Sequence, residues 1–109
     1  MRVYVIFSFF FVENLTGSAY ADTLRGDDNA NVLNGLGGVD TLVGRGGSDT
    51  LLGGDGNDRL QGDLGADTST GGAGADTFVF TLTSDSNSSY GRDTITDFSA
   101  AQLDKIDLR

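Results

Sequence analysis

Large apolar residues recur at every ninth position through the middle of the chain. Seven consecutive segments of nine residues, from Gly17 to Val79, each begin with Gly and carry Asp or Asn at the sixth position. The eighth position is apolar in all of them except one, where it is Ser69, and a weaker unit precedes the first. The apolar column is therefore Leu15, Leu24, Leu33, Leu42, Leu51, Leu60 and Phe78. A period this strict predicts a stacked array of repeats.

Each nine-residue segment, or nonad, predicts a six-residue turn followed by a three-residue strand. Two nonads then complete one flattened turn of 18 residues, with the eighth position pointing inward and the seventh and ninth outward. The predicted fold is all-β: a right-handed parallel β-roll, which is a solenoid of two sheets, with short capping strands at both ends. Ser69 places a hydroxyl in this thin core, and we expect it to weaken its strand.

The chain divides into three predicted parts, namely residues 1–16, the repeats 17–79, and residues 80–109. The first is interpreted as an apolar capping strand. A secretory signal remains an alternative, because an apolar run and an Ala-Tyr-Ala triplet precede Asp22, and an artificial chain start is another. The apolar run is too short for a stable membrane span. A strand is expected at Asp76–Thr83, with Phe78, Phe80 and Leu82 on one face.

The last part offers two short strand-like pieces, RDTITDF and LDKIDLR, which we expect to cover the open end of the stack. Their apolar residues are Ile95, Phe98, Leu103, Ile106 and Leu108. The acidic residues in this part are interpreted as solvated loop carboxylates in preference to ligands of a further ion. They are Asp93, Asp97, Asp104 and Asp107.

The amino-acid composition limits the kinds of site and partner that the chain can have. The chain has no Cys and no His, which removes thiolate sites and the usual general base, so we expect no enzyme activity from it alone. The net charge of −9 makes nucleic acid a poor partner and a multivalent cation a good one.

The sixth positions form two predicted columns, because the turn that stacks on one nonad belongs to the nonad after next. Carboxylates about 4.8 Å apart repel by about 0.9 kcal/mol even in water. A divalent cation between them reverses the sign, and Ca²⁺ fits a set of carboxylate and carbonyl oxygens best. One column is Asp22, Asp40, Asp58 and Asp76, and the other is Asn31, Asp49 and Asp67.

The segments GGDGNDRLQ (53–61) and GGAGADTFV (71–79) resemble the calcium-binding RTX repeat, GGxGxDxUx. The residues that follow resemble the C-terminal module of serralysin-type metalloproteases. The RTX resemblance implies up to five stacked Ca²⁺ sites, each held by two sixth-place carboxylates and by carbonyls of the two turns. The implied backbone ligands are Gly38, Gly47, Gly53, Gly54, Gly56, Gly62, Gly71 and Ala73.

The best site would join Asp58 to Asp76, followed by Asp40 with Asp58 and Asp49 with Asp67. The sites that pair Asp22 with Asp40 and Asn31 with Asp49 are expected to be weaker. Asn31 is neutral, and Tyr20 and Asn29 replace the fourth-place Gly.

The resulting hypothesis is a calcium-binding module for folding, stability and export of a secreted, extracellular protein. A type I secretion apparatus would be its partner, and the chain would be part of a larger protein or a truncated homologue. One alternative is the tail of a secreted metalloprotease or other RTX hydrolase. Another is an adhesive or ice-binding threonine ladder built from Thr23, Thr41, Thr50, Thr68 and Thr77. An EF-hand at Asp27–Asn31 is excluded, because Val32 occupies the obligatory Gly position.

Overall fold

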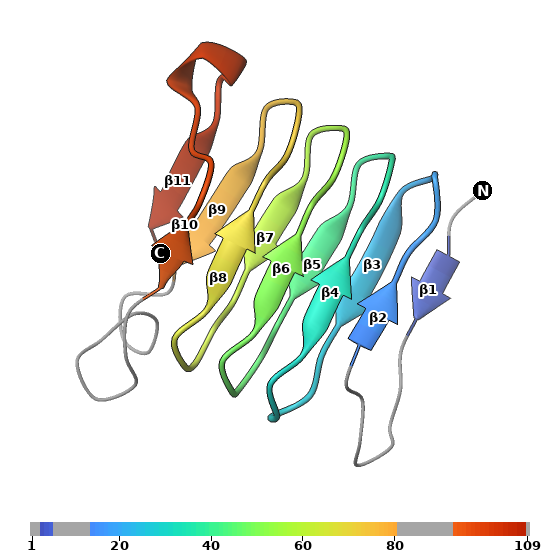
Figure 1. Cartoon of the computed structure of the whole chain (residues 1–109). Coiled ribbons are helices and arrows are strands. Elements are labelled where there is room, and N and C mark those ends of the chain that lie inside the picture. Colours follow the sequence, from blue (N-terminus) through green and yellow to red (C-terminus); the bar gives the residue numbers. More distant parts are fainter. Residues whose placement is uncertain (1–2, 6–13, 81–92, 109) are drawn as a thin grey trace.

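The computed structural model describes residues 3–5, 14–80 and 93–108, and it is a two-layered stack of short strands (Figure 1). The strands are separated by turns of similar length, as the nine-residue period requires. Their bounds are β1 Val3–Val5, β2 Asn14–Thr16, β3 Asp22–Arg25, β4 Val32–Asn34, β5 Thr41–Val43, β6 Thr50–Leu52, β7 Arg59–Gln61, β8 Thr68–Thr70, β9 Thr77–Phe80, β10 Thr94–Ile95 and β11 Lys105–Leu108, with a 3₁₀ helix η1 at Ala100–Gln102.

Successive strands alternate between two parallel sheets. One sheet has the order β1-β3-β5-β7-β9-β11 and the other has the order β10-β8-β6-β4-β2. Within the repeats every strand pairs in parallel with the strand 18 residues away, so that Leu24 faces Leu42 and Leu33 faces Leu51. The predicted β-roll with 18 residues per turn is confirmed.

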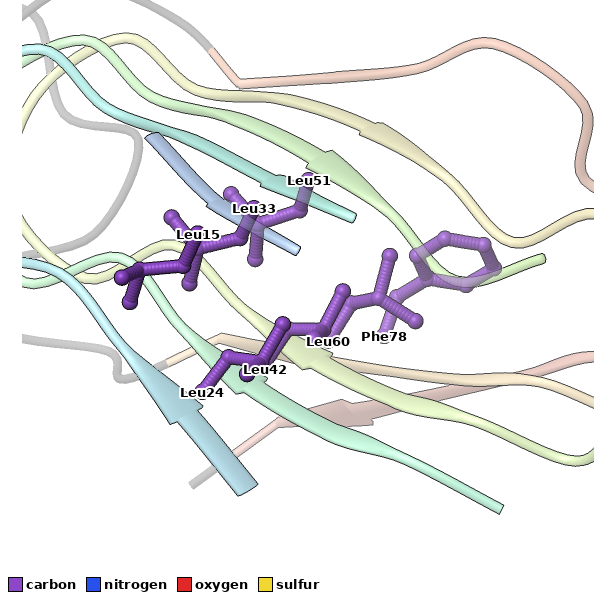
Figure 2. Close-up of a cluster of buried hydrophobic side chains, with 7 residues drawn as sticks. All are labelled: Leu15, Leu24, Leu33, Leu42, Leu51, Leu60 and Phe78. Atoms are coloured by element: carbon purple, nitrogen blue, oxygen red, sulfur yellow. The ribbon is translucent and has the colours of Figure 1, made fainter. Parts of the chain in front are cut away.

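The core is a double row of eighth-place side chains between the sheets (Figure 2). Leu15, Leu33 and Leu51 form the row of one sheet, and Leu24, Leu42, Leu60 and Phe78 form the row of the other. All are buried, and Ser69 occupies the next place in the first row at 8% exposure. The inward position of the eighth residue is confirmed, and so is the hydroxyl in the core.

The C-terminal part adds one more turn to the stack instead of forming a separate cap. β10 pairs with β8, and β11 pairs with β9, in parallel and in register. Ile95 is half-buried against the core, and the Phe98 ring lies 6.3 Å from that of Phe78. The predicted strands are confirmed, and they do lie over the end of the stack.

Most of the apolar residues in this last turn are not buried. Leu103 and Leu108 are more than 60% exposed, and Phe98 and Ile106 are about half exposed. Ile106 occupies the inward position beside Phe78, but β11 and β10 are the last strands of the two sheets. In the described residues no further layer follows to cover these side chains.

The strand expected at Asp76–Thr83 spans Thr77–Phe80, and residues 81–83, including Leu82, lie outside the described residues. Val79 holds a ninth position, which was predicted to point outward, yet it is only 2% exposed because it lies between Gln61 and Asp107 on the neighbouring strands. At the other end β1 pairs with β3, and β2 with β4. No helix in the described ranges is long and apolar enough to cross a membrane.

Candidate metal centre

The sixth-place side chains are all buried, although they are acidic or polar. Their exposed fractions do not exceed 3% for Asp22, Asn31, Asp40, Asp49, Asp58, Asp67 and Asp76. In the first five of them, from Asp22 to Asp58, the main-chain N–H donates to Oδ1 of the residue 18 positions further on, as from Asp40 to Asp58 at 2.8 Å and from Asp58 to Asp76 at 2.9 Å. The same bond links Asn31 to Asp49 at 2.7 Å. The two predicted columns are therefore present.

The other carboxylate oxygen in the middle of the columns has no protein donor. In the described part of the chain, Oδ2 of Asp40, Asp49, Asp58 and Asp76 is buried and accepts no hydrogen bond. An unsatisfied buried polar atom costs about 1–3 kcal/mol, and more when the group is charged. These oxygens are placed to bind a cation.

A backbone carbonyl from the next turn lies beside Oδ2 of Asp40, Asp49 and Asp58. A Cβ added at Gly53 would lie 2.6 Å from Oδ2 of Asp58 and 2.6 Å from the carbonyl oxygen of Gly71. At Gly35 the corresponding distances are 2.5 Å to Asp40 Oδ2 and 2.8 Å to the Gly53 oxygen. The first-place glycine thus leaves open a space on which oxygens from two turns converge. The residues present fit an oxygen-ligated ion such as Ca²⁺.

The turns that carry these oxygens share one backbone conformation. From the third nonad to the seventh, the second and fourth residues have positive φ, for example 88° at Gly54 and 107° at Gly56. Leu36, Arg45 and Asp63 take this conformation without being glycine, which strains the backbone. The fourth-place carbonyls are directed at the next turn, since a Cβ at Gly56 would collide with the Gly38 oxygen.

The first two turns are built differently and are closed by their own hydrogen bonds. The Ser18 N–H donates to Oδ2 of Asp22 at 2.5 Å, and Ser18 Oγ accepts from the Tyr20 N–H at 3.1 Å. In the second turn the Asp27 N–H donates to Oδ1 of Asn31 at 2.9 Å. Neither of these described turns contains a positive φ. The missing fourth-place Gly marks this difference in the sequence.

The family model of the peptidase M10 serralysin C terminal matches residues 12–109. The chain belongs to the serralysin C-terminal family. The predicted resemblance is thereby confirmed, and the family is the non-catalytic C-terminal region of serralysin-type proteases. The comparison with curated proteins finds no match.

Burial sets the electrostatics of this serralysin C-terminal chain. It raises the pKa of Asp49 and of Asp58 from 3.8 to about 8, and the pKa of Asp40 and of Asp76 to about 6. The hydrogen bond from the preceding turn opposes each rise, and the neighbouring carboxylates add to it. Without a cation, the fold therefore favours the protonated form of Asp49 and Asp58 at pH 7, whereas Asp40 and Asp76 are mainly protonated only below about pH 6.

The interpretation of the C-terminal acidic residues as solvated loop carboxylates is wrong for three of the four. The Asp76 N–H donates to Asp104 Oδ1 at 2.8 Å, and the Asp67 N–H donates to Asp93 Oδ1 at 2.8 Å. Asp97 accepts from the N–H groups of Gly71 and Gly72. Asp93 and Asp104 therefore extend the two columns by one turn, with Asp104 6% exposed.

The sequence analysis missed the continuation of the two columns, because the spacing between successive column residues changes in the C-terminal part. Asp67 and Asp93 are 26 residues apart, and Asp76 and Asp104 are 28 apart, instead of 18. The signal that could have found it is the local pattern DTI at 93–95 and DKI at 104–106, which repeats the sixth, seventh and eighth positions of the nonad. The nine-residue period alone could not have revealed this turn, since the inserted residues shift it out of register with the repeats.

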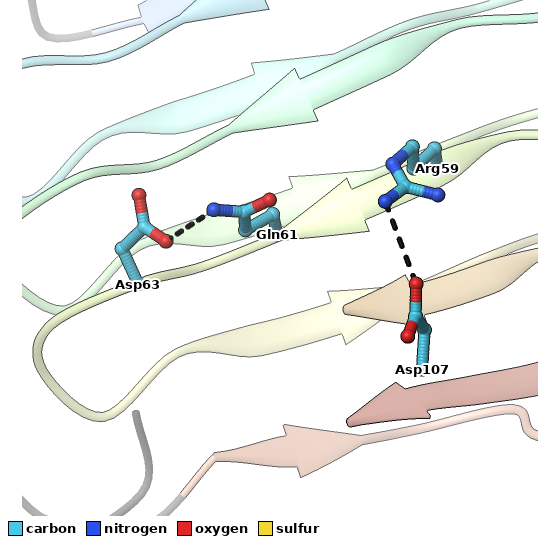
Figure 3. Close-up of polar contacts among 4 residues, drawn as sticks. All are labelled: Arg59, Gln61, Asp63 and Asp107. Carbon is cyan, nitrogen blue, oxygen red and sulfur yellow. Dashed lines mark hydrogen bonds and ion pairs between the residues drawn. The ribbon is translucent and has the colours of Figure 1, made fainter. Parts of the chain in front are cut away.

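Asp107 lies outside the columns, on the outer face of β11. It forms a partly exposed ion pair with Arg59 on β7 at 3.5 Å, and nearby Gln61 donates to Asp63 at 2.6 Å (Figure 3). Arg59 also interrupts the threonine ladder between Thr41 and Thr77. An exposed pair of this kind contributes little to stability.

Each inter-turn space holds few carboxylates. Within the described ranges, no three His, Cys, Asp or Glu side chains gather where they could hold a metal ion. An ion bound there would therefore need backbone carbonyls for most of its ligands. The implied ligands Gly53, Gly62 and Gly71 are buried beside their carboxylates, whereas Ala73 is exposed.

Proposed function

We propose that this serralysin C-terminal chain binds several Ca²⁺ ions, and that calcium drives its folding. The observation that carries the proposal is the buried, unpartnered Oδ2 of Asp40, Asp49, Asp58 and Asp76. Oxygen-only ligands from flexible turns favour Ca²⁺ over Mg²⁺, which needs a tighter octahedron and keeps its waters. The proposed sites lie between Asp40 and Asp58, between Asp58 and Asp76, and between Asp49 and Asp67.

Three features of the chain oppose folding without the ion. The sixth-place carboxylates are buried close to one another, and each glycine adds about 0.5–1 kcal/mol of ordering cost relative to Ala. The strained backbone at Leu36, Arg45 and Asp63, where φ is positive, is the third free-energy cost of folding. When bound, Ca²⁺ supplies positive charge at the unpartnered oxygens. A site whose dissociation constant is one hundredth of the free Ca²⁺ stabilises the fold by about 2.7 kcal/mol.

This energetics suits a protein that folds after export. Cytosolic free Ca²⁺ is far lower than extracellular Ca²⁺, so the chain would stay unfolded inside the cell and fold outside. We propose an extracellular location, a role in folding and export, and a type I secretion apparatus as partner. The family membership supports a module of a larger protein.

The proposed role is non-catalytic. The chain has no His, and the buried carboxylates are used in the columns. We expect no proteolysis by this chain when Zn²⁺ and Ca²⁺ are added. Turnover that a chelator abolishes would favour the alternative, in which the chain carries part of a hydrolase.

Isothermal titration calorimetry tests the binding proposal. Chelator-treated chain titrated with CaCl₂ should bind more than one equivalent, and Mg²⁺ at the same concentration should bind far more weakly. The absence of any Ca²⁺ binding at millimolar concentration would refute the proposal.

A further inference from the structure

Asn34 ends β4 and is followed by Gly35, and the two form the only Asn–Gly pair in the sequence. Asparagine counts among the thermolabile residues of proteins. In water the main-chain nitrogen of the next residue attacks the side-chain amide carbon, and a glycine at that position offers the least steric hindrance to the ring that forms. The surroundings of the pair therefore decide how fast it reacts.

The peptide bond between Asn34 and Gly35 is held on both sides by the neighbouring turns. The Gly35 N–H donates to the Leu52 carbonyl oxygen at 2.8 Å. The Asn34 carbonyl oxygen accepts from the Gly17 N–H, also at 2.8 Å. β4 lies between β2 and β6, so both bonds belong to the interior of the sheet (Figure 1). The glycine nitrogen, which is the nucleophile of the reaction, is thus fixed with its hydrogen directed at another acceptor.

The side chain of Asn34 and the space around Gly35 are also constrained. Oδ1 of Asn34 accepts from the Leu36 N–H at 3.2 Å, which ties the side-chain amide to the turn that follows the strand. A Cβ added at Gly35 would lie 2.5 Å from Asp40 Oδ2 and 2.8 Å from the Gly53 oxygen, so the residue is closely packed. Ring closure requires Asn34 to leave its extended conformation and the Gly35 nitrogen to leave its ladder bond. Both movements require the stack to open locally.

We propose that Asn34 is a site of spontaneous deamidation, which the folded roll suppresses and the unfolded chain exposes. In this reaction a bond forms between the Gly35 nitrogen and Cγ of Asn34. The bond from Cγ to the side-chain nitrogen breaks, and ammonia leaves with the proton of the glycine N–H. Water then opens the cyclic imide at either of its two carbonyls, which gives aspartate or isoaspartate. The net change is the uptake of one water and the loss of one ammonia.

The isoaspartate product does not fit the roll. Its main chain runs through the former side chain, so that one additional carbon separates position 34 from Gly35. Gly35 and the turn that it begins would shift relative to the Leu52 carbonyl. Because β4 and β6 pair in register, an extra backbone atom at this junction disrupts their pairing. The inference goes beyond the proposed calcium function and requires only that the stack opens.

Peptide mapping by mass spectrometry tests the protection. The full chain is incubated at mildly alkaline pH, once folded in Ca²⁺, as verified by circular dichroism, and once unfolded in guanidinium chloride. Asn34 should be converted at least about tenfold faster in the unfolded chain, because the folded chain reacts only through its open state. In denaturant it should also react faster than Asn31, which is followed by the β-branched Val32.

Equal conversion of Asn34 in the two states would overturn the inference, and so would an Asn34 that reacts no faster than Asn31 in denaturant. Because denaturant and not a chelator unfolds the chain, this result is independent of Ca²⁺ binding, which calorimetry tests separately.

Refolding tests the consequence. After the same incubation in guanidinium chloride, the unaltered chain should regain less β-rich signal on dilution into Ca²⁺ than a freshly unfolded sample. Asn34→Gln keeps an amide but forms the corresponding larger ring far more slowly, so it should refold equally before and after incubation. An equal loss in Asn34→Gln, or full refolding of chains that carry isoaspartate at position 34, would overturn this consequence. If Asn34→Gln does not fold, peptide mapping of the unaltered chain still decides the protection.

Discussion

The main-chain N–H of Asp40 donates to Oδ1 of Asp58 at 2.8 Å, while Oδ2 of Asp58 is buried without a partner in the described part of the chain. The two oxygens of the Asp58 carboxylate therefore have different roles. The first fixes the stacking of successive turns and needs no ion. The second faces the next turn, where a proton or a cation would satisfy it.

Replacing Asp58 by Asn should have opposite effects with and without calcium. The amide removes the free-energy cost of burying or protonating this carboxylate, so the metal-free fold should become more stable, while the two sites that share Asp58 lose a ligand. We expect the Ca²⁺ midpoint of folding, followed by circular dichroism, to rise at least tenfold. Asp28→Asn, which removes an exposed carboxylate, serves as control and should leave the midpoint unchanged. Equal midpoints in the two variants would count against a role for Asp58 in binding.

The stability of the metal-free fold should fall as the pH rises. The folded-state pKa is about 8 for Asp49 and Asp58 and about 6 for Asp40 and Asp76, above the ordinary 3.8. A carboxyl whose pKa is raised in the folded state contributes its full stabilisation of the fold below pH 3.8, and this contribution is lost as the pH rises through 6 to 8. Thermal melts in chelator at pH 4, 6 and 8 should show it, whereas melts in Ca²⁺ should show the reverse trend. A metal-free melting temperature that rises with pH would contradict the raised pKa values.

Gly53→Ala should destabilise the calcium-loaded protein by about 1–3 kcal/mol. The added Cβ would lie 2.6 Å from both Asp58 Oδ2 and the Gly71 carbonyl oxygen, in the space proposed for the ion. Gly37→Ala is the matched control, since its Cβ would meet nothing closer than 3.5 Å. Chemical denaturation in Ca²⁺ measures both variants. Similar losses at the two glycines would show that the space beside Asp58 is not critical.

Ser69→Val should stabilise the roll by about 1–2 kcal/mol, because it replaces a buried hydroxyl by methyl groups in the apolar column. Ser69 lies in register between Leu51 and Ile95. Thr68→Val, on the outer face, should change the stability by less than about 0.5 kcal/mol. Thermal melts in saturating Ca²⁺ compare the two. A lower melting temperature for Ser69→Val would mean that this part of the core is already full.

The nine-residue period predicts the parallel sheets, the leucine core and the two acidic columns, because an 18-residue turn places identical positions above one another. It could not predict the last turn, where insertions change the spacing between Asp76 and Asp104 to 28 residues. Nor could it show which oxygens lack a donor. That difference depends on the conformation of each turn. In the first turn the Ser18 N–H donates to Oδ2 of Asp22, whereas Oδ2 of Asp58 has no donor in the described residues.

Far-UV circular dichroism of the chelator-treated chain during a Ca²⁺ titration tests the central claim most directly. At neutral pH the spectrum should change from disordered to β-rich as Ca²⁺ is added and return when the chelator is restored, with Mg²⁺ at equal concentration as control. A spectrum that is β-rich from the start and indifferent to both Ca²⁺ and chelator would contradict calcium-driven folding.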